Sequence, residues 1–257
     1  MAGGAVQLQA SVTVATAPAR NLILQVSVFD PAGNRVASNR SLPVSLLVGE
    51  NASATLQFPS TVSQVVGAYR VELVASSDDS AQPLLSVASA ATINVLPPIR
   101  ITSGAKTSYR DSLGLMWSLD AGFTGGVGED PSTLNYAILN TKDPWLYRAE
   151  RWGGDANGNP APFSYRFAVP PNGKYQVRLL LAENYVTAVG QRLFAVSING
   201  KQVLSEFDIF KEAGGMYIPI DKVFFVQAST TGTLDISFLP GSIESPKSGS
   251  IEIIGVP

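Results

Sequence analysis

The chain has 257 residues, a length that accommodates one large domain or two modest ones and is sufficient to bury a hydrophobic core. Hydrophobic residues make up 45% of it and charged residues only 15%, a composition that is typical of a globular protein and excludes a disordered one. The 18 basic and 20 acidic residues give a formal charge of −2, and neither sign forms a run. This balance argues against nucleic acid as a partner.

The sequence contains neither histidine nor cysteine. These absences exclude Ser-His-Asp triads, thiolate nucleophiles, disulfides and zinc sites built on His or Cys. Carboxylates alone can still hydrolyse a glycosidic bond or hold calcium, so those two chemistries stay open. We expect no cofactor and no metal.

The chain also lacks the apolar segments that membranes and secretion require. No apolar stretch approaches the ~18 to 20 residues of a membrane span, and Met1–Leu8 lacks the basic start and apolar block of a secretory signal. We therefore expect no membrane insertion. The chain is expected to begin either inside a cell or inside a longer secreted parent.

From Val6 to Leu96, short stretches alternate between apolar and polar residues and are separated by turn signals such as Asp30–Asn34. No amphipathic helix lies between them. This pattern predicts an antiparallel, immunoglobulin-like β-sandwich over residues 1–97. Its strands are expected at Val6–Val14, Leu22–Phe29, Val44–Leu47, Ala54–Phe58, Tyr69–Ala75 and Ile93–Val95.

Pro97-Pro98 interrupts this pattern and is typical of a short, stiff linker. Three aromatic residues precede residue 98 and the other 19 follow it, which indicates a separate second domain over residues 98–257. We expect a second β-sandwich, with single helical turns near Ser132–Leu139 and Phe210–Ala213. Asn199-Gly200 is a type I′ hairpin signal. The strands are expected at Tyr175–Leu181, Phe194–Ile198, Leu234–Phe238 and Ile251–Ile253.

Four segments of the second half carry a family resemblance. They are Leu146–Trp152, with the sequence LYRAERW; Leu181–Tyr185, with LAENY, followed closely by Gly190–Gly200; Phe207–Phe210 with Ala213–Gly215; and Pro246-Lys247. In this order they resemble the malectin family of carbohydrate-binding domains. The resemblance implies a jelly-roll β-sandwich that binds a glucose-containing oligosaccharide in a pocket of loops, without catalysis of its own.

The resemblance implies five pocket residues. Trp152 stands where the family has the aromatic residue that ends a Glu-Arg-Tyr run, and Tyr185 and Val186 stand at an aromatic pair whose second ring is missing here. Glu244 occupies an acidic position, and Tyr136 matches an early pocket tyrosine. These residue types fit the chemistry of a sugar. A site that binds a pyranose needs exposed aromatic rings to stack on its apolar face and carboxylates to accept hydrogen bonds from its hydroxyl groups.

Other residues in these segments have structural interpretations. Trp152 precedes a polar loop at the mouth of an expected hairpin, which favours ligand contact over core packing. Tyr147 lies within an apolar alternation and is expected in the core. The four charged residues of the strand-like segments are expected to form a partly buried ion-pair network. They are Glu150, Arg151, Glu183 and Arg192.

Asp155, Asn157 and Asn159 have the alternating oxygen ligands that begin a calcium-binding loop. The glutamate that closes such a loop is absent, because position 166 is an arginine. The spacing therefore does not predict a calcium site.

The leading hypothesis is a non-catalytic carbohydrate-binding protein, a lectin-like module at the binding end of a larger, secreted glycan-processing protein. Its partner is an oligosaccharide or glycan, and its location is extracellular or in the secretory pathway as part of a longer chain. The segment Asp30–Val36 faintly resembles sandwich domains of family-2 glycoside hydrolases of the β-galactosidase type. One alternative is therefore a fragment of such an enzyme, with its catalytic barrel upstream and this chain as an accessory region.

Two further alternatives assign the chain to other classes of protein, an enzyme and a structural or adhesive protein. An enzyme in its own right needs two carboxylates that face each other across a cleft, and the candidates are Glu150, Glu183, Asp208 and Glu244. A structural or adhesive surface protein needs no working pocket. The missing ring at Val186 favours this last alternative.

Overall fold

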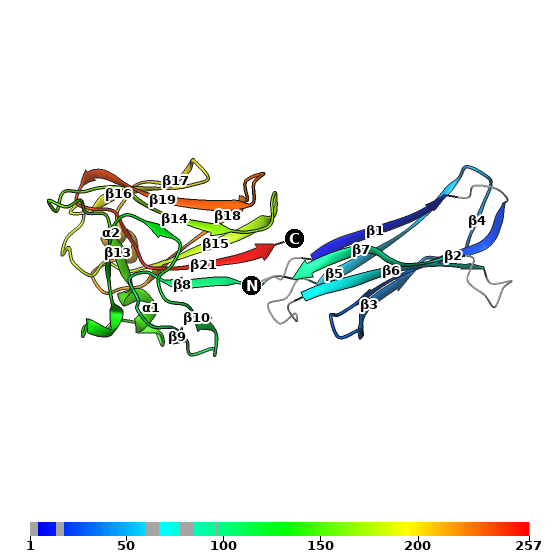
Figure 1. Ribbon diagram of the computed structural model, residues 1–257, viewed down its shortest axis with the longest axis horizontal. Coiled ribbons are helices and arrows are strands. Elements are labelled where there is room, and N and C mark those ends of the chain that lie inside the picture. Colours follow the sequence, from blue (N-terminus) through cyan, green and yellow to red (C-terminus); the bar gives the residue numbers. More distant parts are fainter. Residues whose placement is uncertain (1–4, 14–17, 60–66, 78–84, 96, 257) are drawn as a thin grey trace. The chain divides into compact units, whose positions relative to one another are not determined.

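The computed structural model describes residues 5–13, 18–59, 67–77, 85–95 and 97–256, and its regular secondary structure is almost entirely β-strand (Figure 1). The all-β prediction is confirmed. The chain divides into two compact units, residues 98–256 and residues 1–97 with Pro257. No helix within the described ranges has both the length and the apolar character needed to cross a membrane. Val14 and Leu96, at the ends of predicted segments, lie outside the described residues.

In the first unit, two antiparallel sheets pack face to face. β2 is central to a five-stranded sheet with β3, β4, β6 and β7, and β1 pairs with β5 in a second sheet. Leu24 and Leu73 pack against Ala54 of the opposite sheet, and Val26 and Val71 pack in a neighbouring cluster of buried side chains. The strands are β1 (Ala5–Thr13), β2 (Ala19–Phe29), β3 (Arg35–Arg40), β4 (Val44–Leu46), β5 (Asn51–Pro59), β6 (Gly67–Ser77) and β7 (Leu85–Val95).

The second unit is a sandwich of two larger antiparallel sheets. One has the order β11-β14-β19-β16-β17 and the other the order β18-β15-β21-β8. Buried side chains from both sheets form one core, which includes Tyr165, Val177, Phe194, Phe238 and Ile251. The strands are β8 (Ile99–Thr102), β11 (Phe123–Thr124), β14 (Phe163–Ala168), β15 (Lys174–Leu181), β16 (Leu193–Ile198), β17 (Lys201–Phe207), β18 (Ile220–Gln227), β19 (Thr233–Ile243) and β21 (Ser250–Val256).

The hairpin between β16 and β17 has the turn type that its Asn-Gly sequence predicts. Asn199 and Gly200 have φ angles of 50° and 76°, so both central residues adopt the positive φ of a type I′ turn. The hairpin prediction is confirmed.

Two small sheets and a short helix lie beside the sandwich. The sheets are β9 (Tyr109–Arg110) with β10 (Met116–Trp117), and β12 (Val127–Glu129) with β13 (Glu150–Trp152) and β20 (Lys247–Ser248). Trp117, Leu146 and Tyr147 pack with Leu180 and Ala182 in a second hydrophobic cluster of this unit. This cluster anchors the segments that carry the candidate site.

The helices correct one part of the sequence interpretation. Tyr147 lies in the helix α1 (Pro144–Arg148) and not in a strand, because Pro144 supplies the fixed φ of a first helical turn. Its burial was predicted correctly, since its side chain is only 8% exposed. The predicted turn near Phe210–Ala213 is the helix α2 (Ile209–Ala213), whereas the turn predicted over Ser132–Leu139 is limited to the 3₁₀ turn η1 (Pro131–Thr133).

Candidate functional site

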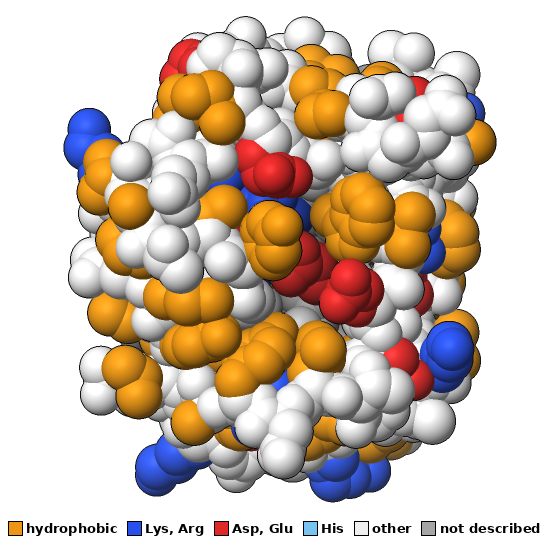
Figure 2. Space-filling model, turned by 90° about the vertical axis from the view of Figure 1, so that its left-hand side faces the viewer, with side chains coloured by type: hydrophobic (Ala, Val, Ile, Leu, Met, Phe, Trp, Pro, Cys, Tyr) orange, Lys and Arg blue, Asp and Glu red, His pale blue; other side chains and the backbone are white. Residues whose placement is uncertain are grey.

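Four loop segments of the second unit meet at the candidate site. They are residues 182–192 after β15, residues 244–246 after β19, residues 134–143 after η1 and residues 214–219 after α2. Backbone hydrogen bonds connect three of them: Leu139 N donates to Tyr217 O and Tyr217 N donates to Glu183 O, each at 2.9 Å. Figure 2 shows acidic side chains gathered at a hollow in the middle of one face, with hydrophobic side chains around them.

The carboxylate of Glu183 organises the first loop. It is completely buried, and its Oε1 accepts hydrogen bonds from the backbone N–H groups of Asn184, Tyr185 and Val186 at 3.0–3.2 Å. Burial raises the pKa of Glu183, but the nearby Lys247 and Arg192 charges and the backbone donors outweigh it and hold the pKa below its usual value. The group is therefore an ionised structural carboxylate.

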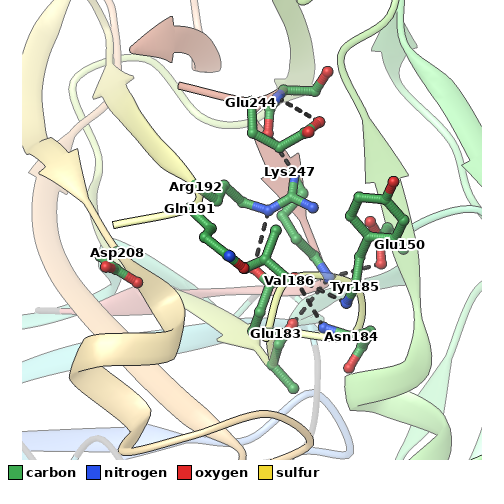
Figure 3. Close-up of polar contacts among 12 residues, drawn as sticks. Glu150, Glu183, Asn184, Tyr185, Val186, Gln191, Arg192, Asp208, Glu244 and Lys247 are labelled. Atoms are coloured by element: carbon green, nitrogen blue, oxygen red, sulfur yellow. Dashed lines mark hydrogen bonds and ion pairs between the residues drawn. The ribbon is translucent and has the colours of Figure 1, made fainter. Parts of the chain in front are cut away.

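Arg192 connects this loop to the loop after β19. Its Nε donates to Glu183 Oε2 at 2.9 Å, and its Nη1 donates to the backbone carbonyl of Ser245. The side chain is only 2% exposed. One buried guanidinium thus joins the segment that carries Tyr185 to the segment that carries Glu244 (Figure 3).

A second buried ion pair lies next to the first. The Nζ of Lys247 is 2.7 Å from Glu150 Oε2 and donates to the carbonyl of Ala182 at 2.9 Å, and Lys247 is completely buried. On the opposite face of β13, Arg151 pairs with Asp120 at 2.8 Å. All four residues of the predicted, partly buried network form buried ion pairs, but only Glu183 and Arg192 pair with each other, whereas Glu150 pairs with Lys247 and Arg151 with Asp120.

Two predicted site residues lie on the joined loops and face outward. Tyr185 is 68% exposed. Glu244 is partly buried, and its Oε1 accepts a hydrogen bond from Ser245 N at 2.9 Å. Glu244 has a φ of 64° and Tyr217 a φ of 61°, a left-handed conformation that is rare for residues other than glycine and that tends to occur at binding sites.

The side chains of Val186 and Tyr136 are less exposed to solvent than the side chain of Tyr185. Val186 is 7% exposed, so its side chain packs into the protein instead of lining an open pocket. Tyr136 is partly buried and stacks on Tyr217 with ring centroids 4.8 Å apart, while the guanidinium of Arg148 lies 5.9 Å from the Tyr136 ring. Burial, followed by the charge of Glu150, raises the pKa of Tyr136.

Trp152 is the last residue of β13 and is partly buried. It pairs with Val127 on one side and with Lys247 on the other, and its ring lies so close to Gly154 that a side chain there would collide with it. The predicted hairpin follows, closed by a bridge between Gly154 and Pro160. Within the described residues, no contact between the aromatic rings of Trp152 and Tyr185 is present.

The spacing of Asp155, Asn157 and Asn159 has a structural explanation. Asp155 Oδ1 accepts from the backbone N–H groups of Asn157 and Asn159, both at 2.8 Å, and Oδ2 accepts from the Asn159 amide. The Asn159 side chain and these backbone donors lower the pKa of the exposed Asp155 carboxyl. Its oxygens are thus used by the turn itself.

Sequence reasoning missed two residues of this site. Tyr217 stacks on Tyr136 and connects two loops, but its position follows from a left-handed backbone that no hydrophobic pattern records. Lys247 stood in a quoted motif without an assigned role. The signal was available, because a lysine that leads into an otherwise apolar closing strand requires a buried carboxylate partner.

The second unit matches a known family model. The model of the malectin domain matches residues 98–247. Malectin-B of Xenopus laevis is 29% identical to this chain over an alignment of 153 residues, and the match covers 54% of this chain and 53% of that protein. The chain spans about half the length of the first curated relatives that it matches.

Two solved structures share the fold over almost the whole chain. The extracellular domain of ANXUR2 from Arabidopsis thaliana matches with a TM-score of 0.56 and 14% identity, over 99% of this chain and 82% of that one. A β-glucuronidase of Bacteroides uniformis matches with a TM-score of 0.51 and 18% identity, over 99% of this chain and 28% of that one. Because the malectin model alone covers more than half of the sequence, this chain belongs to the malectin family.

Proposed function

We propose that residues 98–256 bind a glucose-containing or related oligosaccharide and do not cleave it. Membership of the malectin family supports carbohydrate binding as the class of function. The finer assignment rests on the candidate site, with Tyr185 as the stacking ring and Glu244 as the hydrogen-bond acceptor. Tyr136 and Trp152 are assigned to the flanks of the pocket.

The observation that carries this proposal is the pairing of the exposed Tyr185 ring with the partly exposed Glu244 carboxylate on two loops joined by buried contacts. A tyrosine that is 68% exposed leaves a large apolar surface in water unless a ligand covers it. The apolar face of a pyranose is such a ligand, and its hydroxyl groups donate to a neighbouring carboxylate. Because the loops are fixed before binding, little conformational entropy is lost on association.

Three of the four candidate catalytic carboxylates already have partners within the protein. Glu183 and Glu150 are buried in ion pairs with Arg192 and Lys247. Asp208 accepts from the backbone N–H groups of Gly190 and Lys211, where it caps α2. A general acid needs an available proton near neutral pH, and the ion-paired Glu183, whose pKa is lowered, does not hold one. These contacts support binding without hydrolysis.

A glycan array followed by titration calorimetry with glucose disaccharides tests the proposal. The wild-type protein is expected to bind at least one glucose-containing glycan, and Tyr185→Ala is expected to weaken that binding by about 1–3 kcal/mol. Incubation with the bound glycan is expected to release no product. An array without any hit contradicts the proposal and favours a structural or adhesive role.

We also propose that the chain is the accessory, carbohydrate-binding region of a longer secreted or cell-surface protein, with an immunoglobulin-like first unit as its spacer. The Bacteroides β-glucuronidase supports this arrangement, because a stretch of 28% of its length matches nearly the whole of this chain in fold. The plant receptor ectodomain supports an extracellular setting. Sequencing the gene on both sides of this segment tests the proposal, and an isolated reading frame without a secretion signal contradicts it.

A further inference from the structure

Resting on the proposed function, a further residue can be assigned to the site. We propose that Arg192 is a sugar-binding residue, whose Nη2 donates a hydrogen bond to a ligand hydroxyl group while Glu183 and Ser245 hold the guanidinium in position. Arg192 then acts as a specificity-determining donor between the stacking ring of Tyr185 and the acceptor carboxylate of Glu244.

The hydrogen-bond inventory of the guanidinium leaves one nitrogen available. Nε is bonded to Glu183, and Nη1 is bonded to the Ser245 carbonyl. Within the described part of the chain, Nη2 forms no hydrogen bond with the protein. The fully buried polar atoms without a hydrogen-bond partner do not include Nη2, so this atom keeps some accessible surface. An arginine that is 98% covered therefore presents its last donor edge at the surface of the site.

The position of this edge matches the candidate pocket. In the view of Figure 3, the guanidinium of Arg192 lies below Glu244, above Val186 and to the left of the Tyr185 ring. A sugar hydroxyl is both a donor and an acceptor, so recognition of a pyranose uses protein groups of both kinds. Glu244 supplies an acceptor and Tyr185 an apolar surface, whereas Arg192 supplies the donor that these two side chains lack.

The two protein contacts give Arg192 a fixed direction. A guanidinium presents its donors in a planar fork, so bonds at Nε and Nη1 also fix the orientation of Nη2. The paired Glu183 carboxylate neutralises the charge of the guanidinium, so the free donor acts as a directional hydrogen bond and not as an attraction for anions. A lysine at this position keeps the charge but cannot reach Glu183, Ser245 and the ligand at once.

The experiment is a double-mutant cycle between the protein and the sugar. Wild-type protein and Arg192→Lys are titrated with the glucose disaccharide that the wild type binds best and with each monodeoxy derivative of it. One derivative is expected to bind the wild type about tenfold more weakly than the parent sugar, while Arg192→Lys binds that derivative and the parent equally. A merely structural role for Arg192 weakens binding of every derivative by the same factor.

The matched control is Arg100→Lys. Arg100 forms an ion pair with Glu252 at 2.7 Å, and both side chains are at least nine-tenths buried. This variant is expected to melt at a lower temperature and to bind all the sugars as the wild type does. If Arg192→Lys does not fold, the Nε–H resonance of Arg192 in the wild type is followed during a sugar titration, and it is expected to shift while that of Arg100 does not.

The outcomes separate the two proposals. If the wild type binds a disaccharide but no derivative shows coupling to Arg192, or if the Arg192 resonance is unchanged at saturation, the assignment of Arg192 is wrong and sugar binding stands. If the wild type binds no glucose disaccharide at all, the proposed function is wrong and the assignment of Arg192 falls with it.

Discussion

Glu183 and Arg192 form a buried ion pair, with Nε 2.9 Å from Oε2, in which each partner holds a different loop of the site. Glu183 binds three successive backbone N–H groups around Tyr185, and Arg192 binds the carbonyl next to Glu244. The exposed ring of Tyr185 and the partly buried carboxylate of Glu244 are therefore connected through an almost fully buried ion pair. A low effective dielectric constant strengthens this connection and makes it costly to break.

Removing the exposed ring is expected to affect binding alone. Tyr185→Ala is expected to weaken sugar binding by about 1–3 kcal/mol, by analogy with base stacking on aromatic side chains. The melting temperature is expected to change little, because the ring is 68% exposed. The control is Phe225→Ala, which removes a ring that is 73% exposed on β18 and is expected to leave binding unchanged. Equal affinities of Tyr185→Ala and wild type contradict the assigned stacking role.

Trp152 is expected to contribute to both stability and binding. Its ring is partly buried against Gly154 within the three-stranded sheet, so Trp152→Ala is expected to destabilise the fold by about 1–3 kcal/mol. It is also expected to weaken sugar binding, as the family resemblance implies. Chemical denaturation and calorimetry measure the two effects. A variant that melts lower but binds sugar like the wild type identifies Trp152 as a packing residue only.

The pair of Lys247 and Glu150 tests the cost of an unpaired buried charge. Lys247→Met leaves Glu150 without its partner in a buried position and is expected to lower the free energy of unfolding by about 3–5 kcal/mol. Adding Glu150→Gln to this variant is expected to restore part of the lost free energy of unfolding. The control is Lys222→Met, which breaks a more exposed pair with Glu212 and is expected to cost less than about 1 kcal/mol. Urea unfolding curves decide between these outcomes.

The dependence of stability on pH follows from the lowered pKa of Glu183. A carboxyl group whose folded-state pKa is depressed stabilises the fold above its unfolded pKa, near 4.5, and this stabilisation is lost as the pH falls through the folded value. Stability and sugar binding are expected to be constant from about pH 5 to 8, because the chain has no histidine. Unfolding curves at a series of pH values check this. A transition near pH 6–7 disagrees with it.

The second unit is expected to fold alone. Its two hydrophobic clusters contain residues 98–256 only, and the clusters of the first unit contain none of them. A truncated protein of residues 98–257 is therefore expected to be soluble and to show a cooperative melt with wild-type sugar affinity. A truncated chain that does not melt cooperatively means that the two units depend on each other.

Several strands were predicted from the sequence because one face of each is buried. In β15, residues such as Tyr175 and Val177 alternate with polar neighbours, so a period of two is visible in the sequence itself. β3 was missed because it is an edge strand with almost every side chain exposed, which leaves no such period. The helix α1 was not predicted, because five residues are too few to establish a helical period, although Pro144 marks its start.

The amino-acid sequence by itself determined the all-β fold, the absence of histidine and cysteine chemistry, and the family motifs that contain Glu183, Tyr185 and Lys247. These features depend on residue type and on spacing along the chain. The tertiary structure alone decided which charges meet, because the pairs Glu150–Lys247 and Arg100–Glu252 join residues about 100 and 150 positions apart. Burial is likewise a property of the packed sandwich, which is why only the structure distinguishes the exposed Tyr185 from the buried Val186 beside it.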